Sequence, residues 1–310
     1  MSDYGMPYAG SKSSFIASLA MNFPKADHFY DLFGGGGAVT HYMIKRKDHN
    51  YKHFHYNELN VSVYDLFVRA IKGDFNNSKF KLNWISRDEF FKTKDKDALV
   101  RYIYSFSNNG STYQFGPQIE PYKKSMHMAV VFGEFDSLAK EVFGFDKWPT
   151  NIKTIKAKRL YLRQLIEFYR VKNKLPKVLH QFLPSKQLEQ LQQLERLHRL
   201  QRLEQLHGLN KLNFSSKDYR DVEILPNSVV YCDIPYLNAA NTIKYIKDGF
   251  NHQEFYEWAA SREFPVYISE YVMPHNFICV YQIEKRNLYS SFENKKNINE
   301  KLYWNGRSIN

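Results

Sequence analysis

A strand that runs directly into four glycines is the feature that most constrains the fold of this chain. The stretch HFYDLFGGGG covers residues 28–37, and the helical pattern AVTHYMIKRK follows it. A second strand-like run, YKHFHYNEL, comes next and contains Glu58 near its end. Strand, glycine loop, helix, strand and acidic residue in this order are typical of the start of a nucleotide-binding βαβ unit, so we predict an α/β fold.

The glycine loop also predicts what kind of ligand this unit binds. Phe33, Gly35 and Gly37 form an F-x-G-x-G pattern, and glycine at such a turn lets backbone amides approach a ligand closely. Glu58 lies 21 residues after Gly37, where a carboxylate can accept hydrogen bonds from ribose hydroxyls. The phosphate-binding pattern G-x-x-x-x-G-K-[ST] does not occur. These observations favour a nucleoside cofactor without phosphates, such as S-adenosylmethionine, over a plain structural turn followed by a surface glutamate.

The strand pattern stops after the second strand and returns only after residue 220. The stretch from residue 84 to about residue 177 is mostly helical in pattern, polar and basic, with aromatic residues interleaved. We therefore predict a sheet domain at residues 1–85 and 220–310, interrupted by a mostly helical insertion at residues 86–219. The later strands are predicted in VVYCDI, PVYISEY and FICVYQIEKR.

The charge balance favours a polyanionic partner. Lys and Arg number 44 against 32 Asp and Glu, which gives a formal net charge of +12. This surplus favours nucleic acid or an anionic membrane surface, although it also serves solubility. Cys232 and Cys279 are the only cysteines and lack metal-binding spacing, and Cys232 lies in an apolar run typical of a core. No stretch resembles a leader or a membrane span, so we expect a soluble, cytoplasmic protein without a membrane partner or a bound metal.

One strand ends in an unusual group of residues. The stretch VVYCDIPYLN covers residues 229–238. Asp233 is a hydrogen-bond acceptor, Tyr236 has a flat aromatic ring, and Pro235 stiffens the segment between them. This combination suits a pocket for a flipped-out nucleobase. Lys12, in MPYAGSKSS, is either a solvated lysine or a cation facing a cofactor carboxylate, and beside the glycine loop we favour the second reading.

These motifs occur in the order of one enzyme family. MPYAGSK, DLFGGGG, NEL and DIPY make the sequence resemble the Dam-like adenine-N6 DNA methyltransferases, especially those of bacteriophages and prophages. SFSNNG, IEPYKK and ISEY also resemble stretches of the phage branch. The resemblance implies a Rossmann-like S-adenosylmethionine-dependent methyltransferase sheet, with the insertion as the target-recognition region. It further implies methyl transfer to adenine N6 in a short specific sequence of double-stranded DNA, with base flipping. Cytosine-N4 transfer, methylation of an amine in RNA or another polymer, and an inactive DNA-binding relative are the alternatives.

The matching motifs supply candidate site residues. In the family, the aspartate of the catalytic motif and the backbone carbonyl of the next residue accept hydrogen bonds from the target amino group. The family usually has proline where this chain has Ile234, but the carbonyl survives this exchange, and Pro235 keeps Ile234 extended, so we expect a competent site. The candidates are Asp233, Ile234, Pro235 and Tyr236 for catalysis, and Tyr8, Lys12, Asp31, Phe33, Gly35, Gly37, Glu58 and Asp233 for the cofactor. For DNA they are Asn108, Asn109, Lys123 and Lys124.

A leucine repeat precedes the catalytic strand. In residues 188–212 leucine recurs at every third position, nine times. On an α-helix, steps of three turn by about 300°, so the leucines would circle the axis instead of forming one stripe. A 3₁₀ helix, a compact coil with one leucine-lined edge, and a helix buried on several sides are all open. We favour a structural spacer over an element that contacts DNA directly.

Overall fold

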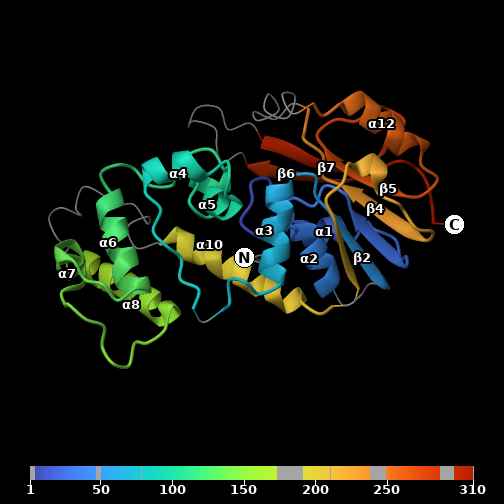
Figure 1. Ribbon diagram of the computed structural model, residues 1–310. Coiled ribbons are helices and arrows are strands. Elements are labelled where there is room, and N and C mark those ends of the chain that lie inside the picture. The colour runs from blue at the N-terminus through green and yellow to red at the C-terminus, as the bar shows by residue number, and fades with distance from the viewer. Residues whose placement is uncertain are drawn as a thin grey trace. The chain divides into compact units, whose positions relative to one another are not determined.

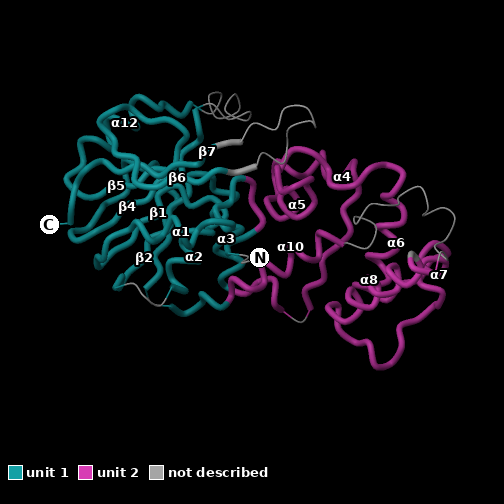
Figure 2. The backbone as a smooth tube through the Cα atoms, turned by 180° about the vertical axis from the view of Figure 1, so that it is seen from behind, with its two compact units in different colours: residues 1–6, 10–72, 205–310 teal, residues 7–9, 73–204 magenta. Residues whose placement is uncertain are grey.

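Two compact units make up the chain, as Figure 2 shows by colour. Unit 1 comprises residues 1–6, 10–72 and 205–310, and unit 2 comprises residues 7–9 and 73–204. The structure is a computed structural model, and it describes residues 4–46, 50–77, 79–172, 191–209, 211–237, 249–286 and 297–309.

Unit 1 contains a mixed sheet (Figure 1). Among the residues that the structure describes, seven strands lie in the order β3-β2-β1-β4-β5-β7-β6. The first five strands in this order are parallel, whereas β7 runs antiparallel to both β5 and β6. This arrangement confirms the predicted α/β, Rossmann-like sheet. The strands are β1 His28–Asp31, β2 His53–Asn57, β3 Leu212–Ser215, β4 Ser228–Cys232, β5 Val266–Glu270, β6 Ile278–Arg286 and β7 Asn297–Trp304.

Alternation along the strands gives the sheet a core on each face. Val229 and Tyr231 of β4 point to the face covered by α1 and α2, whereas Val230 and Cys232 point to the face covered by α12. Cys232 is fully buried, as predicted for a core residue. The helices of unit 1 are α1 Ile16–Ala20, α2 Ala38–Lys45, α3 Val61–Ile71 and α12 His252–Ser261, with 3₁₀ turns η1 Lys12–Ser14 and η4 Tyr219–Asp221.

Two strands were not predicted from the sequence. β3 is a short edge strand, and only two of its four residues are apolar. β7 lies between β5 and β6 although it follows both in the chain, and its polar start hides the strand pattern. Residues 212–215 lie in the sheet, although they fall in the range 86–219 that we predicted for the insertion.

Unit 2 is largely helical over its described residues, as its composition predicted. Ser86, Asp97 and Asp136 cap the starts of three of its helices through their side-chain oxygens. The helices are α4 Arg87–Thr93, α5 Ala98–Ile103, α6 Glu120–Val131, α7 Ser137–Phe143, α8 Ile155–Val171 and α10 Gln192–Gln201, with 3₁₀ turns η2 Phe106–Asn108 and η3 Arg202–Leu206, the last of which crosses the unit boundary. No helix within the described ranges is long and apolar enough to span a membrane.

The described part of the leucine repeat forms the helix α10, the 3₁₀ turn η3 and the start of β3. Leu194, Leu197 and Leu200 lie on one face of α10 and are almost fully buried, whereas Glu195 and His198 on its other face are exposed. The 3₁₀ turn η3 follows, where Leu203 and Leu206 are also almost fully buried, and its period of three matches the leucine spacing. Residues 188–190 and 210 lie outside the described residues.

Candidate active site

The glycine loop after β1 packs tightly on aromatic side chains. A Cβ on Gly34 would lie 2.2 Å from the ring of Tyr56 in β2. Gly37 has φ +67°, and a Cβ there would lie 2.2 Å from the ring of Phe67 in α3. Glycine is therefore required at both positions by packing and backbone conformation, before any ligand is considered.

Glu58 joins the end of β2 to this loop. Its Oε2 accepts a hydrogen bond from the backbone N–H of Gly35 at 2.8 Å, and its Oε1 accepts one from the N–H of Asn60 at 2.8 Å. Burial raises the pKa of this carboxyl, and the two backbone donors oppose the rise. Glu58 thus lies beside the F-x-G-x-G turn, as its spacing in the sequence suggested.

Asp31, at the carboxyl end of β1, has two carboxylate oxygens with different hydrogen bonding. Its Oδ2 accepts hydrogen bonds from the hydroxyl of Thr40 at 2.8 Å and from the Thr40 backbone N–H at 3.2 Å. Its Oδ1 is buried and has no hydrogen-bond partner within the described part of the chain. Burial, with nearby Asp233 and Glu58 adding to it, raises the pKa of Asp31 to about 7. A buried acceptor of this kind is stabilised by a ligand that donates to it.

Lys12 and Asp233 form the central ion pair of the site. Lys12 Nζ lies 2.6 Å from Asp233 Oδ1, and the lysine side chain is 5% exposed. Burial alone would lower the pKa of Lys12, but Asp233, Glu300 and Glu270 together outweigh it, so the pKa is raised. Lys12 is therefore held as a buried cation against the catalytic-motif aspartate, and is not the solvated lysine of the alternative interpretation.

The segment after β4 is fixed by its neighbours. Ile234 is 2% exposed and belongs to the core cluster on the α12 face of the sheet. The backbone carbonyl of Pro235 and Nε2 of His252, the first residue of α12, form a hydrogen bond at 2.6 Å. The Ile234 side chain therefore anchors the segment in the core, and the Pro235 carbonyl anchors it to α12.

Tyr236 is held by a residue of β7 and by the residue that follows β5. Its hydroxyl donates to Glu300 Oε2 of β7 at 2.6 Å, and its ring meets Tyr271 edge-on with 4.5 Å between centroids. Lys12 Nζ lies 4.9 Å from the Tyr236 ring centroid. The sequence analysis missed Glu300 and His252, because no pattern linked either residue to the aspartate motif.

Glu270, at the end of β5, binds the far end of the segment that follows β4. It accepts hydrogen bonds from the backbone N–H of Leu237 at 2.9 Å and of Tyr271 at 2.6 Å. Burial raises its pKa to about 7, with Asp233 and Glu300 contributing. The site therefore gathers carboxylates at the carboxyl ends of β1, β4 and β5, with Glu58 just after β2 and Glu300 on β7.

Two predicted cofactor residues have other surroundings. Phe33 packs against the rings of Tyr219, Phe250 and Phe255 at centroid distances of 5.6–5.8 Å. Tyr8 belongs to unit 2, where its ring lies 5.2 Å from that of Tyr102. Cofactor roles for both residues stay predictions.

The predicted DNA residues lie in unit 2, and they differ in exposure. Lys124 is exposed, but Lys123 is 1% exposed, with Nζ 5.9 Å from the centroid of Phe115. Asn108 has φ +60°, and its Oδ1 is buried without a hydrogen-bond partner among the described residues. Asn109 uses both ends of its amide inside the loop, accepting from Ser111 and Thr112 N–H groups and donating to the Thr112 hydroxyl. Lys124 therefore stays the strongest prediction, because burial of Lys123 and of the Asn108 Oδ1 and the internal bonds of Asn109 disfavour direct contacts.

A comparison with protein families gives one match over most of the chain. The family model described as D12 class N6 adenine-specific DNA methyltransferase matches residues 8–302. The matched range includes the ion pair, the glycine loop and the aspartate motif described above. Within the described ranges, no cluster of three or more His, Cys, Asp or Glu residues could hold a metal ion.

Proposed function

Because the chain belongs to the D12 class of N6 adenine-specific DNA methyltransferases, we propose that the carboxyl ends of β1, β2 and β4 form its active site. The protein is therefore an enzyme that methylates the N6 amino group of adenine in DNA, and the cytosine-N4 and RNA alternatives are set aside. The observation that carries the site is the buried Lys12–Asp233 pair, which lies directly before Ile234 and beside Tyr236.

The donor set suits S-adenosylmethionine, the methyl donor that methyltransferases generally use. When bound, this cofactor supplies a methyl group on a positively charged sulfur. Asp31 offers a buried oxygen that has no hydrogen-bond partner among the described residues, and Glu58 offers a carboxylate next to the glycine turn. A cationic ligand rich in hydrogen-bond donors fits such carboxylates, because burial otherwise opposes their charge. In this proposal Lys12 faces the single carboxylate of the cofactor, Phe33 flanks the ligand, and Gly35 and Gly37 let the loop backbone approach it.

Asp233 and Ile234 prepare the target nitrogen. An adenine amino group is a poor nucleophile, because its lone pair is delocalised into the ring. The Asp233 carboxylate and the Ile234 backbone carbonyl would accept hydrogen bonds from its two N–H groups, which draws the nitrogen lone pair out of conjugation with the ring and raises electron density on N6. Methyl transfer then forms the N6–carbon bond, breaks the sulfur–methyl bond to leave a neutral thioether, and is completed when N6 loses one of its two protons. The carboxylate also stabilises the positive charge that develops on the nitrogen. Correct placement of N6 supplies most of the remaining rate enhancement.

Tyr236 receives the extruded base. Its ring offers a stacking surface that offsets part of the few kcal/mol needed to unstack an adenine from the duplex. The hydrogen bond to Glu300 and the edge contact with Tyr271 fix the plane of the ring in advance. Pro235, held through its carbonyl by His252, keeps the aspartate and the tyrosine at a constant separation.

We further propose that unit 2 binds double-stranded DNA and reads its sequence. The net charge of +12 favours a polyanion, and Lys124 is exposed for phosphate contact. The loop that contains Asn108 exposes Ser111 and Thr112, and hydroxyl groups of this kind can contact base edges in the major groove.

Sequencing with modified-base detection tests this function. DNA from cells that express the protein is expected to carry N6-methyladenine at one short motif, and DNA from cells expressing Asp233→Ala is expected to lack it. Methylation of cytosine, or equal methylation with both proteins, would contradict the proposal. Unmodified DNA from cells that make folded, DNA-binding protein would identify an inactive relative.

A further inference from the structure

The leucine repeat carries a polar residue whose contacts the proposed chemistry does not use. Arg196 lies on α10 among the buried leucines, and it is 8% exposed. In the sequence it reads as one of several solvated residues between leucines. In the structure it is enclosed within unit 2, so its guanidinium must find its partners there.

Those partners lie at the two ends of one loop. Arg196 Nη1 donates to the backbone carbonyls of Ile103 and Ser105, both at 2.7 Å, and to Oε1 of Gln114 at 3.1 Å. Ile103 and Ser105 lead into the loop, and Gln114 directly follows it. One side chain of the repeat therefore holds the entry and the exit of the loop together.

All of these acceptors are neutral. Nη2 of Arg196 also meets a neutral group, Oε1 of Gln192 at 3.4 Å. Burial lowers the pKa of Arg196 to about 10, so the group is still charged at neutral pH. Burying a charge is costly, and here the hydrogen bonds that offset this cost all end on backbone or amide oxygens of unit 2. Three of these acceptors belong to the ends of the loop, so the same bonds that stabilise the arginine also fix the loop.

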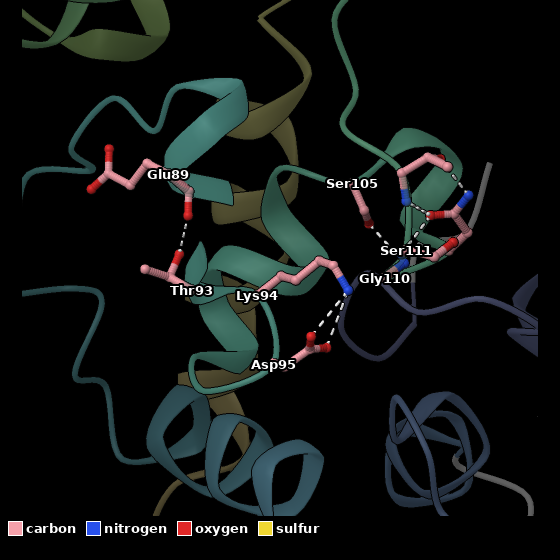
Figure 3. A network of polar contacts seen from close by, with 9 residues as sticks. Glu89, Thr93, Lys94, Asp95, Ser105, Gly110 and Ser111 are labelled. Carbon is pink, nitrogen blue, oxygen red and sulfur yellow. Dashed lines mark hydrogen bonds and ion pairs between the residues drawn. The ribbon is translucent and has the colours of Figure 1, made fainter. Parts of the chain in front are cut away.

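The loop at residues 105–113 needs such support. Ser107 has φ +49° and Asn108 has φ +60°, a conformation that residues other than glycine rarely adopt. Ser105 and Tyr113 form an antiparallel bridge at the base of the loop. Figure 3 shows the hydroxyl of Ser105 directed at the backbone N–H of Gly110, from which it accepts a hydrogen bond at 3.0 Å. Strained backbone of this kind persists only where the surroundings determine it.

We infer that Arg196 is a positioning residue for the loop at residues 105–113, through which the leucine repeat controls DNA sequence recognition without touching DNA. This inference rests on the proposed recognition role of unit 2. Arg196 fixes both ends of the loop and the bonds of Asn109 and Ser105 fix its middle, so the exposed side chains of the loop are held in one arrangement. The repeat is then part of the reading apparatus, and not only the structural spacer that its composition suggested.

Binding and sequencing a random duplex library tests this inference without requiring methyl transfer. The variants are Arg196→Met, which removes the guanidinium group, and Arg196→Lys, which keeps the charge but cannot hydrogen-bond in the planar, two-pronged geometry of a guanidinium. Lys140→Met removes an exposed charge from α7, and Val142→Ala removes buried volume from the same helix, so these two control for charge and for stability.

Wild type and both controls are expected to enrich the same motif. Arg196→Met is expected to lose at least half of the motif's information content, with Arg196→Lys intermediate and cofactor affinity unchanged for both. Full enrichment by Arg196→Met, or an equal loss with Val142→Ala, would overturn the inference. Should Arg196→Met fail to fold, a full-strength motif with Arg196→Lys would overturn it equally. A wild-type protein that enriches no motif would remove the recognition role of the loop and with it this inference, whereas absent methylation in cells would contradict only the catalytic proposal.

Discussion

In unit 1 the proposed site residues lie where neighbouring parallel strands end, whereas in unit 2 the proposed recognition loop is held by a side chain from a helix distant in sequence. β1 and β4 are parallel neighbours, so their carboxyl ends lie side by side and place Asp31 and Asp233 at the same end of the sheet. The loop at residues 105–113 depends instead on Arg196, which is 91 residues away from Ser105. Backbone hydrogen bonds thus place the first site, and buried side-chain hydrogen bonds place the second.

This difference predicts different responses to substitution. A change to a site carboxylate in unit 1 removes a chemical group but leaves the sheet that carries it. A change to a buried polar residue in unit 2, such as Arg196, instead alters the position of other residues to which it is hydrogen-bonded. Substitutions of the site carboxylates should therefore reduce catalysis directly. Substitutions of buried residues in unit 2 should reduce sequence recognition even where those residues do not contact the DNA.

The largest expected effect is that of Asp233→Ala. Removing the carboxylate takes away one acceptor for the amino hydrogens and the stabilisation of the charge on N6, so single-turnover methyl transfer should fall by about 10³-fold or more. Cofactor affinity, measured by calorimetry, should stay within about one order of magnitude. Asp65→Ala, on the exposed face of α3, is the matched control and should leave both unchanged. Comparable activity in the two variants would show that Asp233 has no catalytic role.

A smaller effect is expected when Tyr236 loses its hydrogen bond to Glu300. Glu300→Ala should lower the rate of transfer by about tenfold, which corresponds to loss of one hydrogen bond to a charged group. Tyr236→Phe should have a similar or smaller effect, since Glu300 also favours the charged form of Lys12, and the double variant should be no worse than Glu300→Ala, because that variant already removes the hydrogen bond. Glu263→Ala, at an exposed position, serves as the control. Effects that add in the double variant would mean that Glu300 does not act through Tyr236.

Unit 2 should be weakened locally by acid. His127 on α6 is fully buried between Leu82 O at 2.8 Å and Gln193 Nε2 at 3.2 Å, and burial lowers its pKa to about 4. Because the unfolded pKa is about 6.5, the folded state binds fewer protons between these values, and stability present above pH 6.5 is lost as pH falls toward 4. Hydrogen exchange in α6 and α10 should therefore report a loss of about 2 kcal/mol at pH 5. In His127→Asn this pH dependence should disappear; if it persisted, another group would be responsible.

The smallest effect concerns the protonation of Asp31. Its pKa of about 7 means that the carboxyl is partly protonated at neutral pH, and a cationic ligand should favour the charged form. Binding of S-adenosylmethionine at pH 7 should therefore release about half a proton, measurable by calorimetry in buffers of different ionisation enthalpy. Asp31→Asn should abolish this release while Glu270, with a similar pKa, is still present. The same release from the variant would assign it to Glu270 or another group.

The sequence was sufficient to locate the site residues that lie at the ends of predicted strands. Alternating apolar runs located β1, β2 and β4, so the positions of Asp31, Glu58 and Asp233 followed from the parallel order of a βαβ fold. Glu300 could not be found in this way, because β7 inserts antiparallel between β5 and β6 and its neighbours in sequence do not indicate what it faces.

Other residues escaped prediction because only tertiary packing gives them a role. His252 begins a helix, and its partner is a backbone carbonyl, which carries no sequence signal. Arg196 looks solvated in a repeat rich in Gln, Glu and Arg, and only the packing of the buried face of α10 within unit 2 makes it an internal residue. Lys123 shows the reverse, since a basic residue next to an exposed lysine proved to be buried.

A crystal structure of the enzyme with substrate duplex and a non-reactive cofactor analogue tests the account most directly. The adenine N6 is expected within hydrogen-bond distance of an Asp233 carboxylate oxygen and of the Ile234 carbonyl, with the Tyr236 ring against the base. An adenine that remains stacked in the duplex, or an amino group that meets neither acceptor, would contradict it.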